Sequence, residues 1–161
     1  MKKAFTLIEL LVVMAIMGIL TIITVSQFTT AKTKAGDSQR KADLSSVSKA
    51  LMMYYADYDR FPATIDLTTG GAFTDGTTDP GGLYMKVMPK ENNQVDYPYV
   101  YATNGTNKFI ILGHLKNTQD SDGYKKGTST PRTITCGGRI YNFGFTSPNI
   151  SLDEITDCTS L

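Results

Sequence analysis

Very few side chains in this sequence could take part in catalysis or bind a metal ion. The chain of 161 residues contains one histidine, His114, and two cysteines, Cys136 and Cys158. The cysteines form no Cys-x-x-Cys motif, and a single histidine does not complete a zinc site with them at any common spacing. No nucleophile motif or phosphate-binding loop accompanies His114, so we expect a structural role for it. These observations argue against an enzyme.

One short fragment, Asp120-Ser121-Asp122-Gly123, has the spacing of a metal-binding loop. Two carboxylates at alternate positions before a glycine resemble the start of a calcium loop, but no glutamate stands at the distal position. We therefore favour a solvated turn here. Calcium, with Asp120 and Asp122 as its ligands, is the less favoured alternative, and no other metal or cofactor is expected.

The acidic residue Glu9 lies near the start of a long apolar run. The run from Phe5 to Val25 would span roughly 32 Å as a helix, which matches the hydrocarbon core of a membrane. A carboxylate in such a segment is unfavourable by ~2.5 to 3.5 kcal/mol, so Glu9 needs a role. A secretory signal has a shorter apolar run, and neither that signal nor a simple membrane anchor has a use for the acid.

The segment Lys3-Ala4-Phe5-Thr6-Leu7-Ile8-Glu9-Leu10 resembles the class III signal of type IV pilins and type II secretion pseudopilins. The resemblance implies that a prepilin peptidase cuts after Ala4 and methylates the new amino group of Phe5. It also implies that Glu9 pairs in a filament with the Phe5 amine of a neighbouring subunit. Two departures stand out, because Ala4 replaces the usual glycine and Ser26 stands where many type IV pilins carry a proline.

The apolar pattern predicts one helix from about Phe5 to about Tyr58. No proline occurs before Pro62, and the segment Arg60-Phe61-Pro62 is expected to end the helix. In the second half of this helix, apolar residues recur at helical spacing and form one stripe: Leu44, Val47, Leu51, Tyr54, Tyr55 and Tyr58. Charged residues occupy the other positions, among them Asp37, Arg40 and Lys41.

The rest of the chain predicts strands and loops. Residues 63–82 are dense in Thr, Gly and Asp and indicate a loop. Two β-rich segments, 97–103 and 108–115, flank Asn104-Gly105-Thr106-Asn107 and predict a hairpin, and segments 132–136 and 139–145 are candidate third and fourth strands. The predicted fold class is α+β and type IV pilin-like, with the second half of a long N-terminal helix packed against a small antiparallel sheet.

This organisation predicts three parts: a leader at residues 1–4, a transmembrane and assembly half-helix at 5–27, and an exported globular domain at 28–161. In an exported domain, we expect Cys136 and Cys158 to form a disulfide worth ~3 to 4 kcal/mol, with two free thiols as the alternative. Such a C-terminal loop is similar to the disulfide region of many pilins and less like the major pseudopilin of type II secretion. Pseudopilins bind calcium after their last hairpin strand, which is where Asp120 and Asp122 fall.

The sequence therefore predicts a structural, non-enzymatic protein, the major pilin of a type IV pilus-like filament used in adhesion, motility or DNA uptake. One alternative is a major pseudopilin of a type II secretion or competence system, and another is a singly anchored surface binding domain or enzyme. The resemblance implies a helical homopolymer, a prepilin peptidase, inner-membrane assembly machinery and membrane lipid as partners. The precursor would cross the cytoplasmic membrane once and then enter an extracellular filament. Net charge is +1 and no basic run exceeds two residues, so no nucleic-acid groove is expected.

Overall fold

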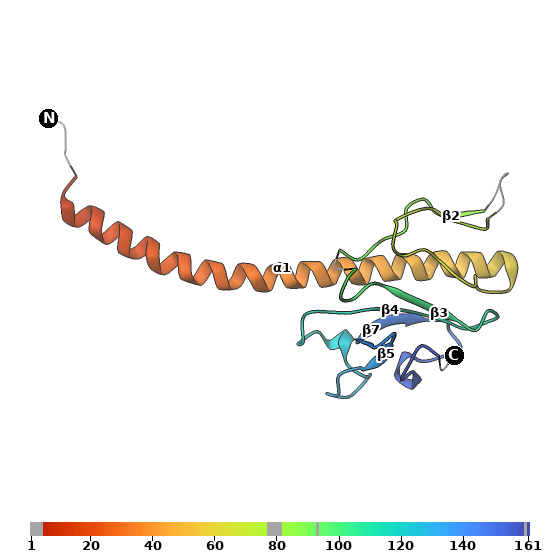
Figure 1. Ribbon diagram of the computed structural model, residues 1–161. Helices are drawn as coiled ribbons and strands as arrows, with labels where there is room; N and C mark the ends of the chain where they lie inside the picture. The colour runs from red at the N-terminus through yellow and green to blue at the C-terminus, as the bar shows by residue number, and fades with distance from the viewer. Residues whose placement is uncertain (1–4, 77–81, 93, 160) are drawn as a thin grey trace. The chain divides into compact units, whose positions relative to one another are not determined.

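One long helix accounts for the first third of the molecule. The computed structural model describes residues 5–76, 82–92, 94–159 and 161, with the side chains of residues 23–26 outside that description. The helix α1 (Leu7–Tyr58) is continuous over 52 residues (Figure 1). It contributes to both compact units of the chain, Met1–Gly36 and Asp37–Leu161. The predicted helix is confirmed. It can extend this far because no proline interrupts it and the strong helix formers Ala, Leu, Met and Lys are frequent along it.

The helix ends where the sequence predicted an exit. Asp59 follows with a positive φ of 51°, a left-handed conformation that Asp tolerates better than most residues and that turns the chain away from the helix axis. Phe61 is buried at 3% exposure, and its N–H donates to the Thr106 carbonyl at 3.1 Å. The exit is therefore fixed by backbone geometry and by a buried aromatic anchor.

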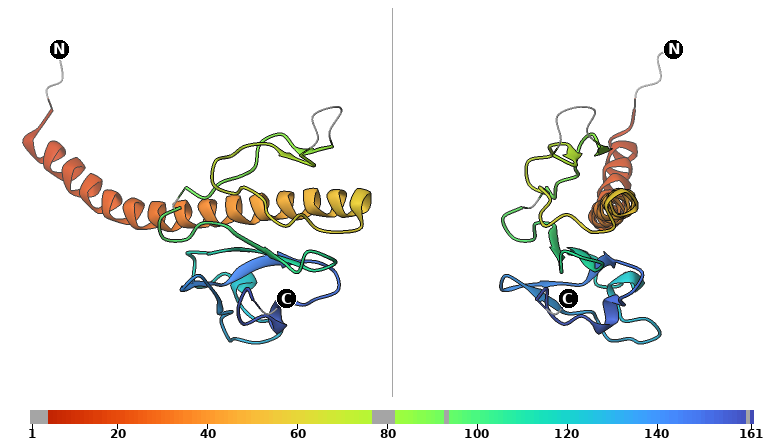
Figure 2. Two further views of the ribbon diagram at one scale, coloured as in Figure 1. Left: turned by 45° about the vertical axis from the view of Figure 1, so that its right-hand side comes forward. Right: turned by 90° about the vertical axis from the view of Figure 1, so that its right-hand side faces the viewer.

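A three-stranded antiparallel sheet lies along the second half of the helix. It consists of β3 (Val100–Thr103), β4 (Phe109–Gly113) and β7 (Phe143–Thr146), in the order β3-β4-β7. Figures 1 and 2 show this sheet on one side of the helix within the unit Asp37–Leu161. Every residue of β4 is buried, because β4 is the central strand and both of its faces are covered.

The predicted hairpin is confirmed as the β3–β4 pair. Its last register pair is Thr103 with Phe109. The turn relies on Asn104, whose Oδ1 accepts hydrogen bonds from Thr106 N and Lys108 N at 3.1 and 3.0 Å. Gly105 has a φ of 76°, which is the conformation that makes glycine favourable after asparagine in such a turn.

The predicted strand over 139–145 is wrong as a single element. It divides into β6 (Arg139–Tyr141), which pairs with β5 (Ile134–Cys136), and β7, which pairs with β4. The break falls at Asn142, whose side-chain amide accepts from Leu115 N at 2.8 Å and donates to Leu115 O at 3.1 Å. Asn142 thus pairs with the backbone of another segment at the point where the chain changes sheet.

The segment predicted as a loop over 63–82, of which residues 77–81 lie outside the described part of the chain, contains a short strand. This strand, β1 (Phe73–Thr74), pairs with β2 (Leu83–Met85), and Phe73 is buried at 6% exposure. The views in Figure 2 place this pair and the β3-β4-β7 sheet on different sides of the helix. Phe73 stacks on Tyr54 with ring centroids 5.6 Å apart, so the burial of one aromatic ring overrides the turn-rich composition around it.

Two apolar cores share the central strand. Phe109 and Ile111 of β4 face a core that includes the helix residues Leu44, Val47 and Leu51, all fully buried. The alternate residues of β4 face a second core on the other side of the sheet, built with Ile134, Tyr141 and Ile155. The period of two along the strand therefore gives each core its own set of side chains.

Two aromatic residues of the predicted stripe are less buried than the rest. Tyr54 is buried, whereas Tyr55 is partly buried and Tyr58, at the end of the helix, is 38% exposed. The Tyr58 ring packs 4.7 Å from Tyr54, and its hydroxyl donates to Asp75 at 2.7 Å. The stripe is confirmed from Leu44 to Tyr54 and weakens over the last turn.

Candidate assembly and ion-pairing sites

The exposed apolar start of α1 is the first candidate site. Every described side chain from Phe5 to Ile22 is exposed, including Phe5 at 86%. The helix is apolar on all sides here, and its length and composition suit a membrane span. A helix of this kind is stable in lipid or among other apolar helices. This stretch of the helix is therefore suited to hold the chain in a membrane or to join it to other chains.

Glu9 caps the N-terminus of this helix. Thr6 precedes the first helical residue, and its N–H and hydroxyl donate to Glu9 Oε2 at 2.9 and 2.8 Å. The Glu9 N–H donates in return to Thr6 Oγ1 at 3.4 Å. This reciprocal arrangement is a capping box, which satisfies N–H groups that have no partner inside the helix. Sequence reasoning placed Glu9 near the helix N-terminus but missed Thr6, although Thr-x-x-Glu is the signal for the motif.

The other residues predicted for processing and assembly lie at the start of the chain. Ala4 is outside the described residues. Phe5 is exposed and precedes the helix, one residue before the capping box. The roles of Ala4, Phe5 and Glu9 in cleavage and subunit pairing stay predictions.

The calcium candidates Asp120 and Asp122 meet around a side chain of the protein itself. Lys41 Nζ donates to both oxygens of Asp120 at 2.6 and 2.8 Å and to Asp122 Oδ2 at 2.6 Å. Partial burial disfavours the charged ammonium, but its hydrogen bonds to the two carboxylates outweigh burial and raise the pKa of Lys41. Burial likewise opposes ionisation of Asp120, yet the hydrogen bond from Lys41 holds the pKa of this carboxyl below its usual value. The turn that we expected to be solvated is an ion-paired loop.

This loop does not fit a calcium ion. Calcium takes six to eight oxygen ligands, and here both carboxylate oxygens of Asp120 and Oδ2 of Asp122 already accept hydrogen bonds from Lys41. The main-chain carbonyl of Asp122 accepts a hydrogen bond from Arg132. Within the described parts of the chain, no group of three or more His, Cys, Asp or Glu side chains is placed to hold a metal ion.

A buried charge cluster lies one helical turn before Lys41. The side chain of Asp37 is only 2% exposed and accepts from the backbone N–H groups of Lys116 and Asn117 at 3.0 and 2.7 Å. Arg40 forms ion pairs with Asp37 at 2.7 Å and with Glu91 at 2.6 Å. The hydrogen bond to Glu91 raises the pKa of the Arg40 guanidinium, although partial burial opposes this shift. The sequence placed Asp37 and Arg40 off the apolar stripe, which is correct, but gave no sign that Asp37 is buried or that Arg40 binds Glu91.

The two cysteines form the disulfide that we expected. Cys136 and Cys158 have Cα atoms 5.5 Å apart, within the usual range for a disulfide. The connection is reinforced by backbone hydrogen bonds, because Thr135 N donates to Thr156 O at 2.9 Å and Cys158 N donates to Thr135 O at 3.3 Å. The disulfide therefore attaches the C-terminal segment to β5.

His114 has structural contacts. Its ring stacks on Tyr97 with centroids 3.9 Å apart, and its Nδ1 lies 3.2 Å from the Ile140 carbonyl. No acid or nucleophile is hydrogen-bonded to it in the described residues. The geometry therefore agrees with a structural role.

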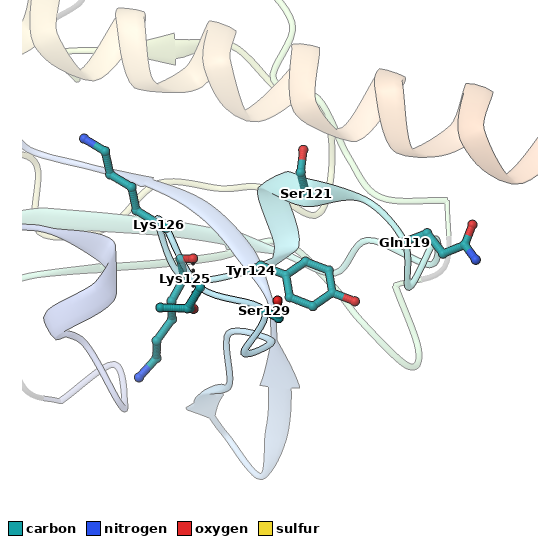
Figure 3. A pocket seen from close by; sticks show the side chains of 8 residues that line it. Gln119, Ser121, Tyr124, Lys125, Lys126 and Ser129 are labelled. Carbon is teal, nitrogen blue, oxygen red and sulfur yellow. Dashed lines mark hydrogen bonds between the residues drawn. The ribbon is translucent and has the colours of Figure 1, made fainter.

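A surface recess of about 640 Å³ lies beside the loop that contains Ser121. Figure 3 shows Lys125 and Lys126 pointing to opposite sides of the segment that carries them. The Tyr124 hydroxyl donates to the Thr118 carbonyl at 2.5 Å, so it is already used by the fold. The lining residues are amide, hydroxyl and ammonium groups without a paired acid and base, so the recess offers no catalytic arrangement.

Comparison with known proteins places the chain in a family. Residues 1–25 match the family described as "Prokaryotic N-terminal methylation motif". The chain is 30% identical to the "Type II secretion system core protein G" of Vibrio cholerae serotype O1 over 138 residues, which cover 83% of this chain and 90% of that protein. The chain belongs to the pilin and pseudopilin family. Like other members of this structural family, it is a pilin-like subunit.

Further relatives of this pilin-like subunit come from two kinds of system. It is 30% identical over 140 residues to the "Type II secretion system core protein G" of Pseudomonas aeruginosa, covering 83% of this chain and 93% of that protein. It is 28% identical over 81 residues to the "Competence protein ComGC" of Halalkalibacterium halodurans, covering 50% of this chain and 79% of that protein. No solved structure gives a significant match.

Proposed function

We propose that this chain is the major subunit of a pseudopilus-type filament and that it polymerises through the first half of α1. The observation that carries the proposal is the match to core proteins G of type II secretion systems over 90% and 93% of their length. The exposed, all-round apolar surface from Phe5 to Ile22 supports assembly through this segment. Prepilin peptidase, inner-membrane assembly machinery and membrane lipid would be the partners before polymerisation.

The proposed division of the chain follows from the roles of its parts. Residues 1–4 are the leader, with cleavage after Ala4 and methylation at Phe5. Residues 5–27 leave lipid and enter a bundle of helices from other subunits. Residues 28–161 form the exported domain. Because lipid and helix bundle are both apolar, this transfer gains little from the hydrophobic effect, and specific polar contacts set the geometry.

Glu9 is the residue that we propose to set the register between subunits. In the free subunit its carboxylate accepts hydrogen bonds from Thr6, so it enters lipid with part of its hydrogen-bonding capacity satisfied. In the filament, the Phe5 amine of a neighbouring subunit would supply the opposite charge. A buried pair of this kind gives specificity more than net stability, because the desolvation of both charges offsets their attraction.

A type IV pilus is the second candidate, and the disulfide favours it. The Cys136–Cys158 link closes a C-terminal segment that is similar to the disulfide region of many pilins. The two candidates share the subunit mechanism and differ in where the filament stands and what it serves. Deletion of the gene separates them by electron microscopy of the cell surface, since a pilus mutant loses long surface filaments, whereas a pseudopilus mutant has none to lose and is impaired in the transport that its system performs.

The mechanism is tested with Glu9→Gln, which removes the charge and keeps the shape of the side chain. We expect this variant to insert in the membrane as well as the unchanged chain and to form no filaments. Glu154→Gln, at an exposed position of the globular domain, is the matched control and should assemble normally. Mass spectrometry of assembled material should find a chain that begins at N-methylated Phe5. Normal filaments from Glu9→Gln, or assembled chains that begin at Met1, would contradict the mechanism.

A further inference from the structure

The loop that carries Asp120 and Asp122 is organised around charges of α1. Lys41 and Asp37 lie four residues apart, so both side chains point from the same face of the helix. The Asp37 carboxylate binds the backbone N–H groups at the start of the loop, and the Lys41 ammonium binds the carboxylates at its end. The N–H donors of the loop therefore bind the Asp37 carboxylate of the helix, and the carboxylate acceptors of the loop bind the Lys41 ammonium.

We propose that the Lys41 ammonium is the permanent cation of the 116–123 loop, so that this subunit closes the loop on α1 without a bound metal ion. The proposal goes beyond filament assembly, since it concerns how the globular unit Asp37–Leu161 acquires its structure. In the family that the chain resembles, pseudopilins bind calcium after their last hairpin strand. In this chain the loop that follows the β3–β4 hairpin binds the side chain of Lys41, which lies 79 residues before Asp120 in the sequence.

The acceptors that a metal ion would need are used within the protein. Asp120 Oδ1 accepts from the Asp122 N–H at 3.0 Å in addition to Lys41, and the Asp120 carbonyl accepts from Gly123 N at 3.0 Å. The Gly123 carbonyl accepts from Arg132 N at 2.8 Å, and the Arg132 guanidinium binds the Asp122 carbonyl. Two cationic side chains thus hold the loop from two sides. Both carboxylate oxygens of Asp120, Oδ2 of Asp122 and the three main-chain carbonyls of residues 120, 122 and 123 already accept hydrogen bonds within the protein, so this set cannot supply the six to eight oxygen ligands that calcium takes.

The ion pair between Lys41 and Asp120 is partly buried, so it contributes more to stability than an exposed surface pair would. The Lys41 side chain is 27% exposed and that of Asp120 is 17% exposed, whereas Asp122 is 55% exposed. The bond to Asp120 is therefore shielded from water and salt, while the bond to Asp122 is screened and contributes less. Removal of the ammonium alone would leave the partly buried Asp120 carboxylate without its cation, which is costlier than removal of both partners.

The test uses the full chain in detergent micelles and amide hydrogen exchange over residues 117–123, in calcium and in EDTA. For the unchanged chain we expect the same exchange rates in both conditions. Lys41→Met should speed exchange in this loop by about tenfold in EDTA, as expected when a partly buried ion pair loses one partner. Lys49→Met is the matched control, since Lys49 is exposed on the same helix, and it should leave the loop unchanged.

A second variant keeps the result interpretable if Lys41→Met disturbs packing in general. Adding Asp120→Asn to Lys41→Met removes the uncompensated charge and should restore slower exchange, whereas damage to packing would not be repaired. The proposal is overturned if calcium slows loop exchange in the unchanged chain by more than about threefold, which would indicate a metal site. It is also overturned if Lys41→Met and Lys49→Met behave alike. None of these measurements depends on filament formation, so they are independent of the assembly mechanism.

Discussion

Replacing Asp37 with asparagine is expected to destabilise the unit Asp37–Leu161 strongly. The Asp37 side chain is 2% exposed and accepts three hydrogen bonds, from Lys116 N, Asn117 N and Arg40 Nη1. Asparagine has the same shape but only one acceptor oxygen, and its NH₂ group would face a donor in place of the second oxygen. If the amide oxygen takes the place of Oδ1, it keeps Lys116 N and Arg40, and Asn117 N loses its acceptor in a buried site; in the opposite orientation both Lys116 N and Arg40 lose theirs.

The size of the effect follows from these contacts. A lost hydrogen bond to a charged group costs ~1.5 to 3 kcal/mol, and a buried donor left unsatisfied costs ~1 to 3 kcal/mol. Arg40 keeps Glu91 as a partner, so its charge is not left uncompensated. The free energy of unfolding should fall by roughly 3 to 5 kcal/mol, and the melting temperature by roughly 10 to 15 °C for a unit of this size.

The measurement is urea unfolding of the full chain in detergent micelles. Near-ultraviolet circular dichroism follows the tertiary structure, because the chain has nine tyrosines and no tryptophan. Asp59→Asn is the matched control, since Asp59 is exposed and has a positive φ that asparagine adopts readily. A loss below about 1 kcal/mol for Asp37→Asn, or one equal to the control, would refute the assigned role of these hydrogen bonds.

Three further outcomes can be measured in the same way. Gly144→Ala would bring a methyl group against the backbone of β4 and should cost ~2 to 4 kcal/mol, whereas Gly71→Ala meets its nearest atom at 3.5 Å and should be close to neutral. Cys158→Ser should cost ~3 to 4 kcal/mol, and reduction of the unchanged chain should cause the same loss. Burial opposes ionisation of Asp120, but the hydrogen bond from Lys41 lowers the pKa of this carboxyl below 3.8 in the folded chain. The stability that this ion pair contributes is therefore present above pH 3.8 and is lost as the pH falls through the lower pKa of the folded state. The urea midpoint of Asp120→Asn should therefore fall less between about pH 5 and pH 2 than that of the unchanged chain.

Local patterns along the chain were sufficient for the helix, the hairpin and the membrane-type segment. The apolar spacing from Leu44 to Tyr54 identifies the buried face of α1, because helical periodicity is a property of neighbouring residues. Asn104-Gly105 identifies the turn, since its conformation depends on those two residues. The uncharged run after Glu9 is long and apolar enough for a membrane span, and both properties can be seen in the sequence. The family also followed from one local motif at the N-terminus.

Tertiary structure alone decided how the polar groups are paired and where the strands divide. Arg40 and Glu91 are 51 residues apart, and Asp37 and Asn117 are 80 residues apart, so no sequence window contains both partners. The same holds for the break at Asn142, which depends on the backbone of Leu115. A charge on a helix surface has the same local pattern whether it meets water or a loop folded onto it. The sequence therefore determined which residues of α1 are apolar and which are charged, and only the packing of the later segments decided that Asp37 and Lys41 bind a loop.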